Sequence, residues 1–137
     1  MKVYFISLIV LSFFLLSACE KNDTPLDGNE ILIGNWINPQ TNESTITYDR
    51  SLRLQDNNYG FTINQNGKFT ERKNAGWCGT PPISYADFEG TWLRDDSLLN
   101  ITVGYWGGLI DYNWKILELN NNKLIIAIIS QEYHTSK

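Results

Sequence analysis

The chain has 137 residues, of which 11 are Lys or Arg and 15 are Asp or Glu, giving a formal net charge of −4 at pH 7. This acidic balance, with no basic stripe along the sequence, lacks the positive charge that binds phosphates, so nucleic acid is not an expected partner. The length fits one domain. Composition therefore predicts a single acidic domain without a nucleic-acid function.

An apolar segment begins the chain. Lys2 is followed by an apolar run from Val3 to Leu16 that is interrupted only by serines. This run is shorter than the roughly 20 apolar residues that a membrane-spanning helix needs, and small residues follow it where a peptidase would cut. These features predict a signal peptide over residues 1–18.

The end of this segment, Leu16-Ser17-Ala18-Cys19, resembles the lipobox of bacterial lipoproteins. The resemblance implies that Cys19 becomes a lipid-modified N-terminus. Two or more acyl chains, at about 0.8 kcal/mol per buried methylene, make such an anchor effectively permanent. The alternative is a chance cysteine after an ordinary secretory signal. We expect a mature protein that is tethered to a membrane by lipid and folds in water.

Residues 19–30 change in composition to Glu, Lys, Asn, Asp, Thr, Pro and Gly, which predicts a flexible tether. The start of this tether partly resembles the export signals of Bacteroidetes lipoproteins, which implies an outer-membrane address on the periplasmic or the cell-surface side. Loss of Lys2 with the signal peptide leaves a mature net charge of 10 − 15 = −5. With Cys19 acylated, Cys78 has no cysteine partner, so the core must hold the fold without a disulfide.

From Ile31 onward, short stretches with alternating apolar residues are separated by turn signals, a pattern typical of β-strands. The expected strands cover residues 31–37, 45–48, 52–54, 59–63, a stretch after Gly67, 83–94, 99–103, 112–119 and 123–129. A shift of apolar parity at Leu117 predicts a bulge near Ile116. No stretch has helical periodicity over ten or more residues. The sequence predicts an all-β domain over residues 31–137, an antiparallel up-and-down β-barrel of about eight strands or a closely related sandwich.

Asn66-Gly67 is the strongest hairpin signal in the chain. A two-residue loop would place Phe69 on the face opposite Ile63 and expose one of them to water. A three-residue loop, Gln65-Asn66-Gly67, with Gly67 left-handed at a bulge, places Ile63 opposite Phe69 on one face. We predict the three-residue loop.

Two Gly-x-Trp triplets, Gly34-Asn35-Trp36 and Gly90-Thr91-Trp92, stand 90 − 34 = 56 positions apart. In an extended chain the glycine and the tryptophan share a face, so the indole points inward while the glycine leaves room for a neighbouring chain. This pair resembles the signature of lipocalin-like and other calycin barrels, and the chain is most similar to small lipocalin-like lipoproteins of Bacteroidetes. The resemblance implies a monomeric barrel that binds a small apolar or amphipathic ligand.

Signals for catalysis are weak. A Cys78 and His134 pair is the sole combination of nucleophile and base, and His134 is near the C-terminus in a segment expected to fray. Asp95-Asp96 fits a solvated turn. The other carboxylates, Asp87, Glu89 and Asp111, are isolated in the sequence and give little support for the acid and base pair of a glycoside hydrolase. The sequence has no nucleophile elbow, phosphate loop or zinc-binding His-Glu-x-x-His motif. We predict no enzyme, no cofactor and no metal site.

Large aromatic residues in glycine-rich connections are the remaining candidates for function. Trp77 lies within residues 74–82, expected to be an ordered loop if its ring packs, and Tyr105 and Trp106 lie within residues 104–108. Loops at a barrel mouth commonly contact ligands, so these three residues are the predicted ligand site. The alternative is that the rings plug the barrel end.

A second functional class stays open, a non-enzymatic envelope interaction module that binds a protein or glycan. It is favoured if side chains fill the barrel, because eight strands enclose a space that a few large residues can occupy. The residues expected to do so are Phe88, Trp92, Ile101, Trp114 and Ile126. Asp96-Ser97-Leu98 also resembles the O-glycosylation acceptor motif of Bacteroidetes. An intact mass without added sugar would exclude glycosylation of Ser97.

Overall fold

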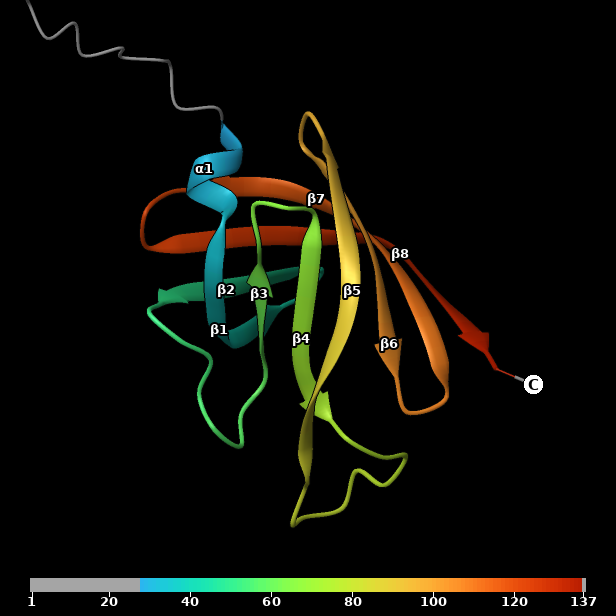
Figure 1. Ribbon diagram of the computed structural model, residues 1–137. Coiled ribbons are helices and arrows are strands. Elements are labelled where there is room, and N and C mark those ends of the chain that lie inside the picture. The colour runs from blue at the N-terminus through green and yellow to red at the C-terminus, as the bar shows by residue number, and fades with distance from the viewer. Residues whose placement is uncertain (1–27, 137) are drawn as a thin grey trace, which may run out of the picture.

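Eight strands and one short helix make up residues 28–136, the part of the chain that the computed structural model describes (Figure 1). The elements are α1 (Gly28–Leu32), β1 (Gly34–Asn42), β2 (Thr45–Ser51), β3 (Gly60–Ile63), β4 (Lys68–Asn74), β5 (Tyr85–Asp95), β6 (Leu98–Tyr105), β7 (Gly108–Leu119) and β8 (Lys123–Thr135). The predicted signal peptide, Cys19 and most of the predicted tether lie outside these residues. Within residues 28–136, no helix has the length and apolar character needed to cross a membrane.

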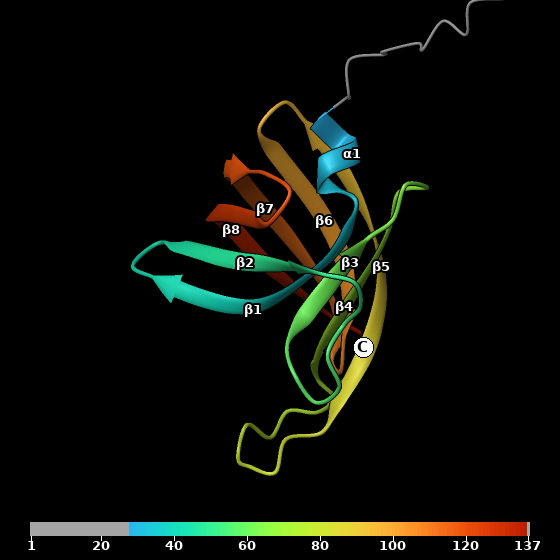
Figure 2. The same ribbon diagram turned by 90° about the vertical axis from the view of Figure 1, so that its left-hand side faces the viewer.

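The strands form a closed barrel in the order β1-β2-β8-β7-β6-β5-β4-β3, and all neighbours are antiparallel. This confirms the predicted antiparallel barrel of eight strands. The order departs from a simple up-and-down path at one place, because β1 lies between β2 and β3. The β1–β2 hairpin extends to one side of the barrel in Figure 2.

The connection from β2 to β3 contains residues 52–54, and their predicted strand is wrong. The Ser51 hydroxyl donates to the Arg53 carbonyl (2.8 Å) and accepts from the Arg53 amide (3.4 Å), which turns the chain locally. The Leu52 side chain is fully exposed, so its alternation with Leu54 did not report a buried face. Strand β1, expected to end before Pro39, instead continues through an irregularity between Ile37 and Gln40.

The β3–β4 hairpin has the predicted register. Ile63 pairs with Phe69, Gly67 has a φ of 78°, and the Asn64 amide donates to the Lys68 carbonyl (3.0 Å). The three-residue loop is therefore confirmed, and with it the inward parity of every second residue along β4. The bulge predicted near Ile116 is also present.

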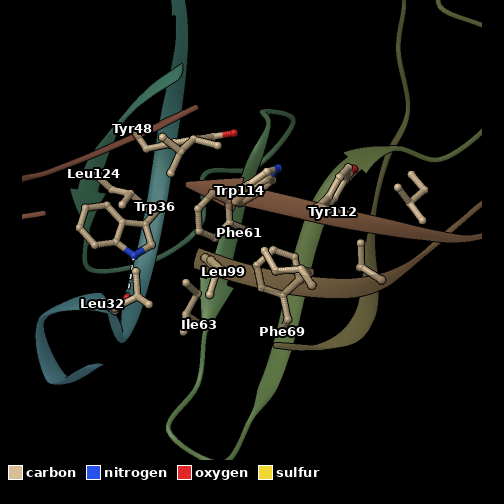
Figure 3. Close-up of a cluster of buried hydrophobic side chains, with 14 residues drawn as sticks. Leu32, Trp36, Tyr48, Phe61, Ile63, Phe69, Leu99, Tyr112, Trp114 and Leu124 are labelled. Carbon is tan, nitrogen blue, oxygen red and sulfur yellow. Dashed lines mark hydrogen bonds between the residues drawn. The ribbon is translucent and has the colours of Figure 1, made fainter. Parts of the chain in front are cut away.

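The α1 end of the barrel is filled by apolar side chains. Trp36 is completely buried, and its indole N–H donates to the Leu32 carbonyl (2.9 Å), as Figure 3 shows. Rings of Phe61 and Trp114 continue the packing into the middle of the barrel, with centroids 5.5 Å apart. The helix α1 was not predicted, because five residues are too few to show helical periodicity. Its last residues were expected to be strand.

The glycine of the second Gly-x-Trp triplet leaves room for a neighbouring strand, as expected, whereas Gly34 of the first lies against the Arg50 side chain. A Cβ on Gly90 would lie 2.7 Å from the Val103 Cα and closer still to the Thr102 carbonyl oxygen, so the glycine permits the close approach of β5 and β6. The Trp92 indole donates to the Asn64 carbonyl (2.8 Å). Near Gly34, the Arg50 guanidinium lies 4.3 Å from the centre of the Trp36 ring.

Strand β8 extends through the predicted frayed end, and that prediction is wrong, since His134 pairs with Leu109 of β7. The polar sequence of this segment gave no strand signal, because the residues that hold it in a strand lie in β7. Strand β2 pairs only with residues 123–127 of β8. Among residues 28–136, the rest of β8 has no second strand beside it. Ile129 and Tyr133 are exposed along this edge.

Candidate ligand site at the barrel mouth

The end of the barrel opposite α1 carries the β4–β5 loop and the β6–β7 turn (Figure 1). We call this end the mouth. An open pocket of about 250 Å³ lies there, and Trp77, Tyr105 and Trp106 all line it. The structure thus brings together three residues that the sequence places in two separate connections. Tyr59 and Tyr133 also line this pocket, which we call the mouth pocket.

Aromatic rings form the wall of the mouth pocket. The Tyr105 ring stands edge-to-face with Trp106 (centroids 5.5 Å apart, 78°) and with Tyr133 (5.4 Å, 85°). The Trp106 side chain is still 56% exposed and that of Trp77 is 80% exposed. These two indoles do not plug the barrel end, because most of their surface is open to water, whereas the Tyr105 ring packs against the buried core. They remain available to a ligand.

The β4–β5 loop is held by hydrogen bonds near its base. The Asn74 side chain donates to the Cys78 carbonyl (2.7 Å) and accepts from the Gly76 amide (3.1 Å). The Ala75 amide donates to the Ser84 carbonyl (2.7 Å). This loop was predicted to be ordered if Trp77 packs. The Trp77 ring is mostly exposed, and the hydrogen bonds of Asn74 hold the base of the loop instead.

The floor of the mouth is polar. Glu71 and Lys73 lie on β4 with the inward parity of Phe69, and their side chains are only 17% and 12% exposed. The Lys73 ammonium donates to a Glu71 carboxylate oxygen (2.6 Å), and the Tyr112 hydroxyl donates to the same carboxylate (3.3 Å). Lys73 and Tyr112 line the mouth pocket, while Glu71 lines a smaller neighbouring pocket of about 90 Å³. We call Glu71, Lys73 and Tyr112 the floor cluster.

Burial controls the protonation of the floor cluster. Desolvation raises the pKa of the Glu71 carboxyl, and the charge and hydrogen bond of Lys73 oppose that rise, as does the Tyr112 hydroxyl. Burial and the nearby Glu71 charge raise the pKa of the Tyr112 phenol, which keeps it a neutral donor. Tyr48, which also faces Glu71, has a raised pKa for the same reasons. A buried ion pair of this kind costs desolvation energy, which is typical of sites kept for function.

A glutamine at position 71 tests this account through the pH dependence of stability. Because the folded-state pKa of Glu71 is raised, its contribution to stability is complete below the unfolded pKa and is lost as the pH rises through the folded pKa. We therefore expect the unfolding free energy of the wild type, relative to Glu71→Gln, to fall as pH rises from about 4 towards neutrality. Urea unfolding of both proteins across this range measures the difference. A relative stability that rises with pH contradicts the assignment.

The floor cluster was not predicted from the sequence, although the signal for it is present. The three-residue hairpin loop that places Phe69 inside also places Glu71 and Lys73 inside by alternation. Charged residues at those positions in a barrel strand are unusual, because an unpaired buried charge is costly. Parity counted past the hairpin would have identified both residues.

The candidate catalytic residues do not pair with one another as a nucleophile and base would. A hydrogen bond from the Thr80 backbone and a weaker one from the Thr80 side chain lower the pKa of the exposed Cys78 thiol. His134 Nε2 instead lies 2.8 Å from an Asp111 carboxylate oxygen. Asp87 makes a two-point ion pair with Arg72 (2.6 and 2.8 Å). Asp95 ends β5 and Asp96 follows it in the β5–β6 turn. The Glu89 carboxylate accepts a hydrogen bond from the Thr70 hydroxyl. Within residues 28–136, no group of three or more His, Cys, Asp or Glu residues is arranged to hold a metal ion.

Comparison with known proteins leaves the geometry as the basis for assigning a function. A scan against protein-family models finds no match. Searches of the curated proteins and of the solved structures find none either. The features of the molecule that bear on its function are therefore the mouth pocket and the floor cluster.

Proposed function

We propose that the protein is a lipid-anchored envelope protein whose barrel mouth binds a small amphipathic molecule. The observation that carries this proposal is the meeting of Trp77, Tyr105 and Trp106 around one pocket of about 250 Å³. Aromatic walls with a few converging polar groups are typical of small-molecule sites. The packed rings of Phe61 and Trp114 in the middle of the barrel restrict the ligand to the mouth. The ligand is accordingly small.

Binding is tested on the non-acylated protein, residues 20–137, which contains every described residue. Native mass spectrometry detects a molecule that co-purifies from a bacterial host, and tryptophan fluorescence follows a panel of lipids, haem and sugars. Replacing both Trp77 and Trp106 with alanine is expected to weaken binding by about tenfold or more, since rings of this kind supply much of the affinity of a site. Leu93→Ala, at an exposed residue of β5, is the matched control and is expected to bind as the wild type does. Undiminished binding by the double variant contradicts the proposed site.

The lipid anchor is a separate part of the proposal and rests on the resemblance of Leu16-Ser17-Ala18-Cys19 to a lipobox. Cys19→Ser is expected to release the protein from the membrane fraction and to remove the added mass of the acyl chains. Detergent phase partitioning and intact mass spectrometry measure both effects. A Cys19→Ser protein that stays in the membrane fraction contradicts acylation at this residue. Protease treatment of intact cells then distinguishes the cell surface from the periplasm.

The second candidate is an envelope interaction module with a filled barrel. The filled core favours it, since Ile101, Trp114 and Ile126 are buried and Phe88 and Trp92 pack against them. The exposed edge of β8 favours it too, because an unpaired strand edge can accept a strand from another protein. A clean apo mass, with no response to the ligand panel, would favour this candidate over the small-molecule binder.

A further inference from the structure

Lys73 has hydrogen-bonding capacity that the protein itself leaves unused. An ammonium group carries three N–H donors. Among residues 28–136, the one acceptor within hydrogen-bond distance of Lys73 Nζ is the Glu71 carboxylate, at 2.6 Å. The Lys73 side chain is only 12% exposed and lines the mouth pocket. A bound molecule that covers it must supply acceptors, because a buried donor left unpaired costs free energy.

The charge of the floor cluster selects among ligands. Lys73 and Glu71 together are neutral when both are ionised, so an anionic head group would add a net negative charge to a poorly hydrated site. A cationic group would meet Lys73, whose ammonium already lies 5.4 Å from the Phe88 ring centre and 5.7 Å from that of Tyr112. A purely alkyl molecule would leave the Lys73 donors unpaired. Neutral oxygen acceptors fit best.

The wall of the mouth pocket selects the rest of the molecule. The exposed indoles of Trp77 and Trp106 offer flat apolar surface, and the Tyr59 and Tyr133 rings border the same pocket. A molecule that combines several neutral hydroxyl groups with an apolar C–H face satisfies both the wall and the floor. A saccharide ring has this combination, and one or two such rings suit a pocket of about 250 Å³.

We infer that the mouth pocket binds a neutral saccharide ring, whose hydroxyl oxygens accept hydrogen bonds from Lys73 and whose C–H face packs against Trp77 and Trp106. This inference rests on the proposed function, since it names the class of ligand for the same pocket. The polar end of the ligand lies at the floor cluster and its apolar face at the wall. Lys73 is then the residue that makes the pocket select a sugar over an alkyl ligand of similar size.

The test uses residues 20–137 with D-glucose, D-galactose, D-mannose, N-acetyl-D-glucosamine and maltose as neutral probes, and D-glucuronate and laurate as anionic probes. Saturation-transfer NMR and tryptophan fluorescence at up to about 10 mM detect even weak binding. We expect at least one neutral sugar to bind, with D-glucuronate and laurate binding more weakly. Lys73→Met is expected to weaken sugar binding by about tenfold, as for loss of a hydrogen bond from a charged group. Lys68→Met, at an exposed lysine of the same strand, is expected to change nothing.

A second variant guards against misfolding, because Lys73→Met removes the positively charged partner of Glu71 and leaves it only the Tyr112 hydroxyl. The double variant Glu71→Gln with Lys73→Met replaces the pair with neutral side chains of similar size and is expected to fold and to lose sugar binding. If none of the sugars binds but laurate binds in a manner that depends on Trp77 and Trp106, the saccharide inference is wrong and the proposed pocket stands. If no probe binds, both are wrong. Sugar binding that survives in the folded double variant also overturns the role of Lys73.

Discussion

Replacing Gly90 with alanine is expected to lower the free energy of unfolding by about 3 kcal/mol or more, a large fraction of the roughly 5–15 kcal/mol that stabilises an ordinary domain. The added Cβ would lie 2.7 Å from the Val103 Cα and closer still to the Thr102 carbonyl oxygen. Both are main-chain atoms of β6, so no side-chain rotation relieves the overlap. The strands β5 and β6 would have to separate where Gly90 pairs with Val103. Urea unfolding followed by circular dichroism measures the loss.

Gly79→Ala is the matched control for this experiment. A Cβ at Gly79 would have no atom within 4 Å, so the same chemical change meets no obstacle there. We expect its unfolding free energy to stay within about 0.5 kcal/mol of the wild type. A Gly90→Ala protein as stable as Gly79→Ala would show that the close approach of β5 and β6 is not required.

Replacing Trp36 with alanine is expected to lower the free energy of unfolding by about 3–5 kcal/mol. The ring is completely buried and its indole N–H bonds to the Leu32 carbonyl (2.9 Å), which ties α1 to β1. The Arg50 guanidinium, which lies over this ring, also donates to the Ile33 carbonyl (2.9 Å) and to the Ile31 carbonyl. Loss of the ring therefore leaves a cavity and removes both the hydrogen bond to Leu32 and the surface on which Arg50 lies, which together hold α1. Thermal and urea unfolding both report the effect.

Trp106→Ala removes the same side chain from an exposed position and serves as the control. Its ring is 56% exposed, so we expect a loss of stability of no more than about 1 kcal/mol. Trp36→Phe keeps most of the apolar volume and removes the indole N–H, so an intermediate loss is expected. Equal losses for Trp36→Ala and Trp106→Ala would contradict the structural role given to the first triplet.

The parts of the fold that sequence patterns predicted are the local ones. The register of Ile63 with Phe69 follows from the loop length and from alternation, both of which act over a few residues. The placement of β1 between β2 and β3 depends on pairing between distant segments, which no local pattern encodes. The end of β8 was missed for the same reason, since its polar residues are held in a strand by β7.

Sequence patterns identified the residues of the pocket wall but not those of its floor. Trp77, Tyr105 and Trp106 stood out because a large ring has no structural need to be in a glycine-rich connection, and they do meet at one pocket. Lys73 and Glu71 were overlooked because charged residues in strands are ordinarily exposed. Their burial is visible only once the inward face of β4 is known.

The opposite positions of α1 and the mouth bear on how the protein would face its surroundings. The described chain begins at α1, and the mouth loops are at the other end of the barrel in both ribbon views (Figures 1 and 2). If Cys19 carries the proposed acyl chains, the residues between it and α1 span at most about 30 Å. The bilayer then lies on the α1 side, and the pocket opens towards the aqueous medium. In that arrangement a ligand would reach the pocket from the water rather than from within the membrane.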